Sequence, residues 1–257
     1  MKITRRQFCH AVAALSAAAL LGGCSQQGAE RAVNADGEPM FQLKLAHNMA
    51  EDHVVHIQLS AFAQEVSEKS EGSIQIQIIP NGTLGSETDM ITQIQADGLD
   101  MAKVSASTLG NFSEQFNAFS VPCVFDSQEH YYNVMDSDLV EEIYESTENG
   151  GFRGLFWLDS GARSFYTADT PIRVPSDLKG LKIRTMDSQM AIDMMKYFGG
   201  SATVMGYSDI YTGMQQGVID GAENNVTALR DHGDVTQYYC FDEHTRIPLS
   251  LIHISEP

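Results

Sequence analysis

Basic residues are scarce in this 257-residue chain, and the scarcity excludes one large class of function. Lys and Arg number 16 against 34 Asp and Glu, so the formal net charge is −18 at pH 7. Proteins that bind nucleic acid need clustered positive charge to neutralise phosphates, and the folded part of the sequence holds no basic patch. We therefore expect no nucleic-acid partner and interpret the acidity as a solvated surface.

The motifs of several enzyme classes are also missing. The sequence has no Gly-x-Gly-x-x-Gly, no P-loop and no Gly-x-Ser-x-Gly elbow, so neither nucleotide binding nor hydrolysis has support. His47, His53 and His56 lie close together, but no Cys partner or clear carboxylate ligand accompanies them at metal spacing. We interpret these histidines as solvated or helix-capping side chains, and we expect no catalysis, no cofactor and no metal ion.

A run of about 20 apolar residues, the length that crosses a membrane as a helix, is absent. The apolar stretch at 11–21 is shorter, follows Lys2, Arg5 and Arg6, and ends in Leu-Gly-Gly-Cys at residues 21–24. This pattern resembles a bacterial export signal with a lipobox, so we predict that residues 1–24 are a signal and that Cys24 carries lipid. An ordinary signal peptide that is cleaved nearby is the alternative.

Three further features accompany the expected export signal. Residues 4–8, Thr-Arg-Arg-Gln-Phe, resemble a twin-arginine motif, although the general pathway also needs basic residues there. The polar residues 25–39 are typical of a flexible tether, which would hold the protein outside the cytoplasm on its lipid. Loss of the three basic residues with the signal takes the net charge from −18 to −21.

Cysteine is the next scarce residue, with four in the chain. Cys9 and Cys24 belong to the signal, which leaves Cys123 and Cys240 for the folded part. An oxidising compartment allows a disulfide between them, but sequence does not give their distance. We favour two separate buried thiols.

Beyond residue 40, apolar residues alternate between the period of a strand and the period of a helix. Strands are expected at 41–46, 74–78, 99–105, 152–158, 181–185, 202–205 and 219–222, and helices at 54–66, 86–96, 129–147, 188–198, 207–216 and 226–238. This order predicts an α/β fold with a mostly parallel sheet, in two lobes with a ligand cleft between them. We assign residues 40–160 to the first lobe, 161–247 to the second, and 248–257 to the start of a return to the first.

Two arginines stand out in this acidic chain. Arg163 follows the expected strand that ends at Leu158, and Arg184 lies at the end of the strand at 181–185. The planar guanidinium suits a carboxylate because it can donate two parallel hydrogen bonds. The alternative is that each is a surface arginine paired with one of the many acidic residues.

Several short segments together resemble the solute-binding proteins of TRAP transporters, the DctP-like family. They are Gly161-Ala162-Arg163, 175–184 (PSDLKGLKIR), 207–211 (YSDIY), 217–224 (GVIDGAEN), 62–66 (FAQEV), 84–87 (LGSE), 98–101 (GLDM) and 121–122 (VP). The resemblance runs from Met40 to about Ser250. It implies a two-lobed, periplasmic-binding-protein-like fold that closes on a small organic acid, such as a dicarboxylate, a keto acid or a sugar acid.

The resemblance also implies a set of ligand-binding residues. Arg184 occupies the position of the main carboxylate-binding arginine, with Arg163 as the second arginine and Asn224 as a hydrogen-bonding amide. Tyr207 matches an aromatic residue of the pocket wall. Asn48, Glu87 and Ser105 fall where the family places variable specificity residues, although a turn residue and a helix N-terminal acid are the alternatives for the first two.

The resemblance implies, finally, a partner and a longer chain. The partner is the membrane part of an ion-gradient-driven transporter, to which a monomeric binding protein delivers the acid. The alternatives are the binding protein of an ATP-driven importer and a twin-arginine-exported enzyme. Because the family continues beyond Pro257 and residues 252–257 depart from its pattern, we interpret residues 248–257 as truncated or artefactual, and we expect this polypeptide to be marginally stable.

Overall fold

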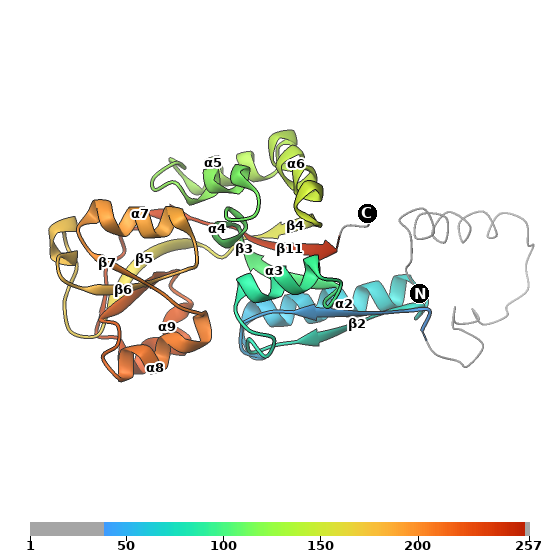
Figure 1. Cartoon of the computed structure of the whole chain (residues 1–257), viewed down its shortest axis with the longest axis horizontal. Helices are drawn as coiled ribbons and strands as arrows, with labels where there is room; N and C mark the ends of the chain where they lie inside the picture. The colour runs from blue at the N-terminus through green and yellow to red at the C-terminus, as the bar shows by residue number, and fades with distance from the viewer. Residues whose placement is uncertain (1–38, 255–257) are drawn as a thin grey trace, which may run out of the picture.

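The computed structural model describes residues 39–254, which form two lobes that each contain one sheet flanked by helices (Figure 1). The expected signal, Cys24 and nearly all of the tether lie outside the described residues. The two-lobed α/β architecture is the one expected from the sequence. No helix in the described part of the chain combines the length and the apolar character that crossing a membrane requires.

The first lobe is built on a five-stranded sheet. Its order is β2-β1-β3-β11-β4, with β1 parallel to β2 and β3, and β11 antiparallel to β3 and β4. The strands are β1 (Phe41–Ala46), β2 (Ile74–Ile79), β3 (Met101–Ser105), β4 (Phe152–Leu158) and β11 (Leu249–Ile254). The helices are α2 (Val54–Lys69), α3 (Glu87–Gln95), α4 (Ala106–Leu109), α5 (Gln128–Met135) and α6 (Asp138–Glu145), with 3-10 turns η1 (Glu114–Ser120) and η2 (Ser146–Gly150).

The second lobe has its own sheet, ordered β10-β5-β8-β6-β7, with β9 paired to β5. Helix α7 lies on one side of this sheet, and α8 and α9 lie on the other (Figure 1). The strands are β5 (Ala162–Thr167), β6 (Lys182–Thr185), β7 (Ser201–Val204), β8 (Gly221–Asn224), β9 (Tyr238–Tyr239) and β10 (Thr245–Arg246). The helices are α7 (Gln189–Phe198), α8 (Ile210–Gln215) and α9 (Ala228–His232), with 3-10 turns η3 (Pro175–Leu178), η4 (Tyr207–Asp209) and η5 (Gly233–Val235).

The chain crosses between the lobes at residues 159–161 and again at residues 247–248. The two crossings lie side by side, because Leu249 pairs with Leu158 in one lobe and Thr245 pairs with Arg163 in the other. The Ser160 hydroxyl ties them together by donating to the carbonyl of Ile247 at 3.1 Å. A paired crossing of this kind can act as a hinge between two otherwise rigid lobes. The lobe boundaries expected from the sequence, after residues 160 and 247, stay a prediction.

The core of the first lobe follows from strands whose neighbouring residues face opposite sides of the sheet. In β11, Leu251 belongs to a buried cluster on the side of α2, and Ile252 belongs to a cluster with α3, α5 and α6. In β3, Met101 likewise belongs to the cluster on the side of α2, and Ala102 belongs to the cluster on the other side. Both faces of the sheet are therefore covered, which explains why every residue of the central strand β3 is buried.

Several expected elements differ from the observed ones. The sheets are mixed rather than mostly parallel, because β5, β9, β10 and β11 pair antiparallel with their neighbours. The single helix expected at 129–147 is divided into α5 and α6. At the division the Ser137 hydroxyl donates to the carbonyl of Val134, so a side chain competes with the helical backbone for its acceptors. The helix expected at 226–238 is reduced to α9 and η5.

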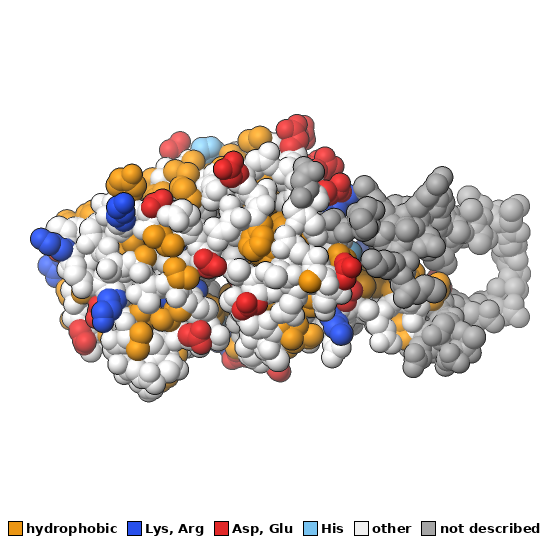
Figure 2. Space-filling view, in the orientation of Figure 1, with side chains coloured by type: hydrophobic (Ala, Val, Ile, Leu, Met, Phe, Trp, Pro, Cys, Tyr) orange, Lys and Arg blue, Asp and Glu red, His pale blue; other side chains and the backbone are white. Residues whose placement is uncertain are grey.

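The remaining sequence expectations concern the cysteines and the surface. Cys123 and Cys240 are separate free thiols, as favoured, but Cys123 is exposed and Cys240 is half-buried, so the interpretation of both as buried thiols is wrong. Acidic side chains are dispersed over the face drawn in Figure 2 rather than gathered in one patch. This dispersal agrees with a solvated acidic surface.

Candidate ligand-binding site

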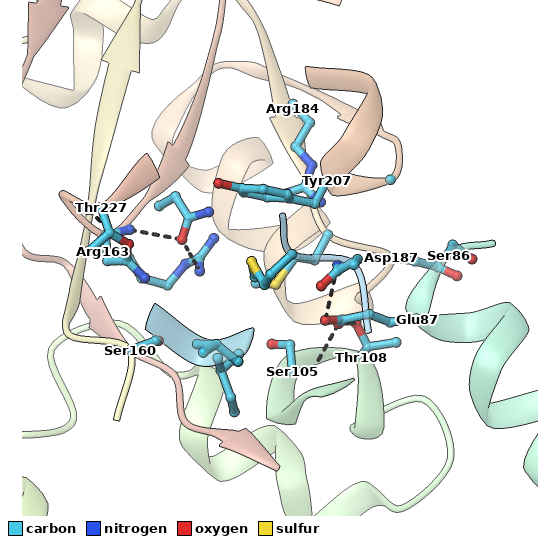
Figure 3. A pocket seen from close by; sticks show the side chains of 18 of the residues that line it. Ser86, Glu87, Ser105, Thr108, Ser160, Arg163, Arg184, Asp187, Tyr207 and Thr227 are labelled. Atoms are coloured by element: carbon cyan, nitrogen blue, oxygen red, sulfur yellow. Dashed lines mark hydrogen bonds between the residues drawn. The ribbon is translucent and has the colours of Figure 1, made fainter. Parts of the chain in front are cut away.

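A cavity of about 470 Å³ lies between the lobes and is lined by residues of both. Its size falls within the range of small-molecule sites, roughly 300–1,000 Å³. All seven residues expected from the sequence lie on its wall, namely Asn48, Glu87 and Ser105 from the first lobe and Arg163, Arg184, Tyr207 and Asn224 from the second. Figure 3 shows Arg184 and Tyr207 on the second-lobe side, facing Glu87, Thr108 and Ser105 on the other.

The strand arrangement of the second lobe brings three of these residues to one edge of its sheet. Arg184 and Asn224 lie near the carboxyl ends of the parallel strands β6 and β8. Arg163 lies near the start of β5, which runs antiparallel to β8 in a register that places Ser164 opposite Asn224. The start of β5 therefore meets the ends of β6 and β8. Arg163 belongs to a strand rather than to the loop expected from the sequence.

Arg184 is a buried cation that lacks an anionic partner within the described residues. Its side chain is 4% exposed, and its Nε donates to the carbonyl of Met205 at 2.9 Å. Neither terminal nitrogen of the guanidinium has a protein acceptor in this part of the chain, and burial lowers the pKa of Arg184. A buried charge without a partner is costly. The cavity therefore presents a guanidinium edge that an anion can pair with.

Arg163 is equally buried but is held by acceptors of the protein. Its Nε and Nη2 donate to the two carboxylate oxygens of Glu223 at 2.6 and 2.9 Å. Nη2 also donates to the Glu223 carbonyl at 2.7 Å, and Nη1 donates to Asn224 Oδ1 at 2.8 Å. Burial alone would lower the pKa of Arg163, but the Glu223 carboxylate raises it above the ordinary value. Four of the five N–H groups of this guanidinium are thus used within the protein.

Glu223 is in turn supported from behind the cavity. Burial opposes its charge, but Arg163 and His244 bring the pKa of this carboxyl down to about 2. His244 lies 3.7 Å from Glu223 and contacts Asp242 at 2.5 Å through Nδ1. Burial would lower the pKa of His244, but Asp242 and Glu223 raise it. Arg163 therefore belongs to a network of paired acidic and basic side chains, which fixes the position of its guanidinium.

Asn224 has an amide whose orientation the network defines. Its Oδ1 accepts from Arg163 Nη1 and from the backbone N–H of Asn225 at 2.9 Å. The amide nitrogen Nδ2 has no acceptor among the described residues, and Asn224 lies on the cavity wall. Arg184 and Asn224 together present donors enough for both oxygens of one carboxylate.

Tyr207 contributes its ring to the cavity wall, while its hydroxyl points elsewhere. The hydroxyl donates to Asp231 Oδ2 at 2.6 Å, and burial, with the Asp231 carboxylate, raises the pKa of Tyr207. The ring also packs against His232, with centroids 5.0 Å apart. Tyr207 is thus held with its ring as an apolar part of the cavity wall.

The first-lobe side of the cavity is organised around Glu87, the first residue of α3. Its Oε1 accepts from Lys103 Nζ at 3.0 Å and from Asn48 Nδ2 at 3.4 Å. Its Oε2 accepts from the backbone N–H of Ser105 at 2.9 Å and from the Thr108 hydroxyl at 3.1 Å. Burial would raise the pKa of this carboxyl, but Lys103 and the other donors lower it. Glu87 is therefore an ionised group on the cavity wall.

His53 also lines the cavity and was not expected to bind a ligand. Its Nδ1 accepts from the backbone N–H of Val55 and so caps α2, as one interpretation of the sequence had it. Burial lowers the pKa of His53, so the ring is neutral and its proton sits on Nε2. The other two histidines contact each other, with His47 Nε2 3.0 Å from His56 Nδ1. No group of three or more potential metal ligands is arranged for a metal ion within residues 39–254.

Two α/β lobes on a paired crossing, with a cavity between them that contains a buried cation, define a periplasmic binding protein. The chain matches the bacterial extracellular solute-binding protein family 7 (DctP) over residues 45–254, and it belongs to that family. An uncharacterized protein of Salmonella typhimurium, YiiZ, is 42% identical over 219 residues, which cover 84% of this chain and 66% of the relative. The chain spans 66%, 58% and 63% of the length of three curated relatives.

Solved structures of TRAP periplasmic solute-binding proteins are also similar to this chain. That from Anaerococcus prevotii, with bound D-glucuronate, is 40% identical with a TM-score of 0.81, and the match covers 83% of this chain and 70% of that one. That from Sulfitobacter, with bound β-D-galacturonate, is 33% identical with a TM-score of 0.80 and covers 83% and 72%.

Proposed function

We propose that this protein captures a small sugar acid outside the cytoplasm and delivers it to the membrane subunits of a TRAP transporter. The observation that carries the proposal is the buried Arg184 guanidinium, which faces a cavity between hinged lobes without an anionic partner in the described part of the chain. Similar proteins with bound uronates support an acid with hydroxyl groups as the ligand. Because those similar proteins are TRAP solute-binding proteins, a TRAP transporter is favoured as the partner over an ATP-driven importer.

The binding mode follows from the donors on the second lobe. The ligand carboxylate pairs with Arg184 and accepts from Asn224 Nδ2, while Arg163 holds the Asn224 amide in place. Closure of the lobes then shields the pair from water, which strengthens it. A lobe arrangement that depends on ligand gives the transporter a loaded state to recognise.

Titration calorimetry with D-glucuronate and D-galacturonate tests the proposal. Arg184→Ala removes the unpaired cation, and we expect at least a roughly 100-fold loss of affinity, because charge-assisted pairs in buried sites have effects of this size. Arg173→Ala, which removes an exposed arginine of the same lobe, is the matched control and should bind as the wild type does. Binding of neither acid, or equal binding by Arg184→Ala, would contradict the proposal.

We also propose that Cys24 anchors the protein to the membrane through lipid. The support is the basic start, the short apolar stretch and the Leu-Gly-Gly-Cys sequence at residues 21–24. In cells that express the chain with its N-terminus, a palmitate label should enter the protein and should be lost in Cys24→Ala. Label that persists in this variant would place the modification elsewhere.

A further inference from the structure

We propose that the cavity selects acids with one carboxylate and several hydroxyl groups and rejects acids with a second carboxylate, because Glu87 dominates its first-lobe wall. The inference rests on the proposed function, which places the first carboxylate on Arg184. It narrows the acids implied by the family resemblance, since it excludes dicarboxylates.

Glu87 is held as a charged group at a fixed position. Four donors reach its two oxygens, from Lys103, Asn48, Ser105 and Thr108. The donor from Asn48 is long, at 3.4 Å, so Oε1 keeps capacity to accept from a ligand hydroxyl. Because α3 begins at Glu87, the start of that helix adds further positive potential that favours the ionised form.

Lys103 cannot serve a second ligand carboxylate. Its side chain is 0% exposed, and its ammonium donates to Glu87 Oε1 at 3.0 Å and to Asn48 Oδ1 at 2.6 Å. It stands behind these two side chains and is not part of the cavity wall. Its charge therefore balances Glu87 rather than the ligand.

No first-lobe residue of the described cavity wall is a lysine or arginine. The carboxylates there are Glu87 and, at the crossing, Asp159, whose Oδ1 accepts from Gly161 N at 2.8 Å. The other polar side chains are neutral, including His53, whose Nε2 carries the proton, and Ser105, whose hydroxyl oxygen accepts from Ser107 N. Asp187 adds a third carboxylate at the rim, where its exposed side chain accepts from Thr88 at 2.8 Å through Oδ2. Figure 3 shows it beside Glu87.

These groups treat a hydroxyl and a carboxylate differently. A hydroxyl can donate to Glu87 or Asp187 and accept from His53, so it satisfies both kinds of group. A carboxylate only accepts, and it would meet the buried charge of Glu87, with other carboxylates nearby, without a first-lobe cation on the wall to offset them. The first-lobe side should therefore bind the hydroxyl end of a sugar acid.

The test compares acids that differ at the end away from the first carboxylate. Calorimetry on the purified protein would measure D-gluconate, D-galactonate and D-glucuronate against D-glucarate and D-galactarate, which carry a second carboxylate there. We expect the best monocarboxylate to bind at least roughly 100-fold more tightly than either dicarboxylate, because juxtaposed like charges cost several kcal/mol. Affinities of wild-type protein within threefold of each other would overturn the inference.

A charge-removing variant assigns the effect to Glu87. Glu87→Gln keeps the shape of the side chain, and we expect the ratio between monocarboxylate and dicarboxylate affinities to shrink at least about tenfold. Glu65→Gln changes the net charge equally on an exposed surface of α2, and it should keep the wild-type ratio. If Glu87→Gln folds, as its thermal transition would show, and keeps the wild-type ratio, Glu87 is not the selective group.

The outcomes separate this inference from the proposed function. If both acid classes bind equally and both depend on Arg184, the inference fails and the proposed function stands. If no acid of the panel binds, the proposed function fails and the inference fails with it. If the variant does not fold, the wild-type ratio decides the inference alone.

Discussion

The two buried arginines of the second lobe have the same burial but differ in whether a carboxylate pairs with them directly. Glu223 offsets the charge of Arg163, so Arg163 adds little net attraction for an anion. The charge of Arg184 is not paired with a carboxylate, because its only hydrogen bond in the described part of the chain is to a carbonyl. One guanidinium thus provides the charge, and the other holds an amide in the orientation that binding needs. Such preorganisation lowers the entropic cost of capturing a ligand.

The sequence indicated which residue types would meet at the site but not how they pair. The position of Arg184 at a strand end could be predicted, because apolar and polar residues alternate along the strand that carries it. The partner of Arg163 could not, because its contact with Glu223 depends on the register between β5 and β8. His53 was missed as a wall residue because its cavity position depends on how α2 faces the second lobe. No local pattern encodes either relation.

His47 should make the protein less stable in acid. The ring is 0% exposed, and burial, with help from Lys103, lowers its pKa from 6.5 to about 3. Between these values the unfolded chain binds a proton that the folded protein does not, so stability falls as the pH falls below 6.5. One such proton changes the free energy of unfolding by about 1.4 kcal/mol per pH unit, or about 2 kcal/mol between pH 6.5 and 5.

The variant His47→Asn isolates this effect from other titrating groups. Asn can still accept from the backbone N–H of Met49, as His47 Nδ1 does, but it does not titrate. Denaturant unfolding at pH 6.5 and 5 should show a smaller loss of stability in this variant than in wild type. His130→Asn, at a partly exposed histidine, should lose as much as wild type. Equal losses in His47→Asn and wild type would mean that His47 is protonated in the folded state.

At the level of elements, those with strong local signals were predicted well. The helix expected at 86–96 is observed as α3, one residue shorter at each end, and it begins at Glu87 because Ser86 and Asp89 form a reciprocal capping box. Strand β5 was missed, since residues 163–167 are all buried and show no alternation of apolar and polar side chains. Its tight fit is visible at Gly221 of β8, where a Cβ would lie 2.3 Å from the carbonyl oxygen of Tyr166. The need for glycine at this position arises from the packing of two strands, so it cannot be recognised from the sequence of one strand.

On the scale of the whole molecule, the lobes touch at several places besides the hinge, and two of these contacts are made by charged side chains of the second lobe. Asp187 of the second lobe accepts from Thr88, and its carbonyl accepts from Asn111 Nδ2 at 2.8 Å. Arg230 of α9 pairs with Asp52 of the first lobe. Ser160 of the hinge and Asp187 lie at opposite ends of the cavity in Figure 3. The contacts with Asp187 therefore close the cavity on the side away from the crossings, and ligand binding and lobe closure stabilise each other.

Asn111→Ala tests this coupling because Asn111 bridges the lobes without lining the cavity. An ordinary hydrogen bond contributes about 1 kcal/mol, so its loss should weaken binding of every ligand by about fivefold. The ratio between two sugar acids should not change, because the variant alters closure rather than contacts with the ligand. Calorimetry gives both quantities, and small-angle scattering of the ligand-free protein should show a larger radius of gyration.

The control for lobe closure is Arg230→Ala. Its ion pair with Asp52 is more than half exposed on both sides, with side chains 51% and 69% accessible, so solvent screens it. We expect at most about a twofold change in affinity. A fivefold loss in Asn111→Ala beside a small loss in Arg230→Ala would place the closing contact at Asp187. A change in ligand preference in Asn111→Ala would instead mean that this rim shapes the cavity itself, and that closure and selectivity are not separable in this protein.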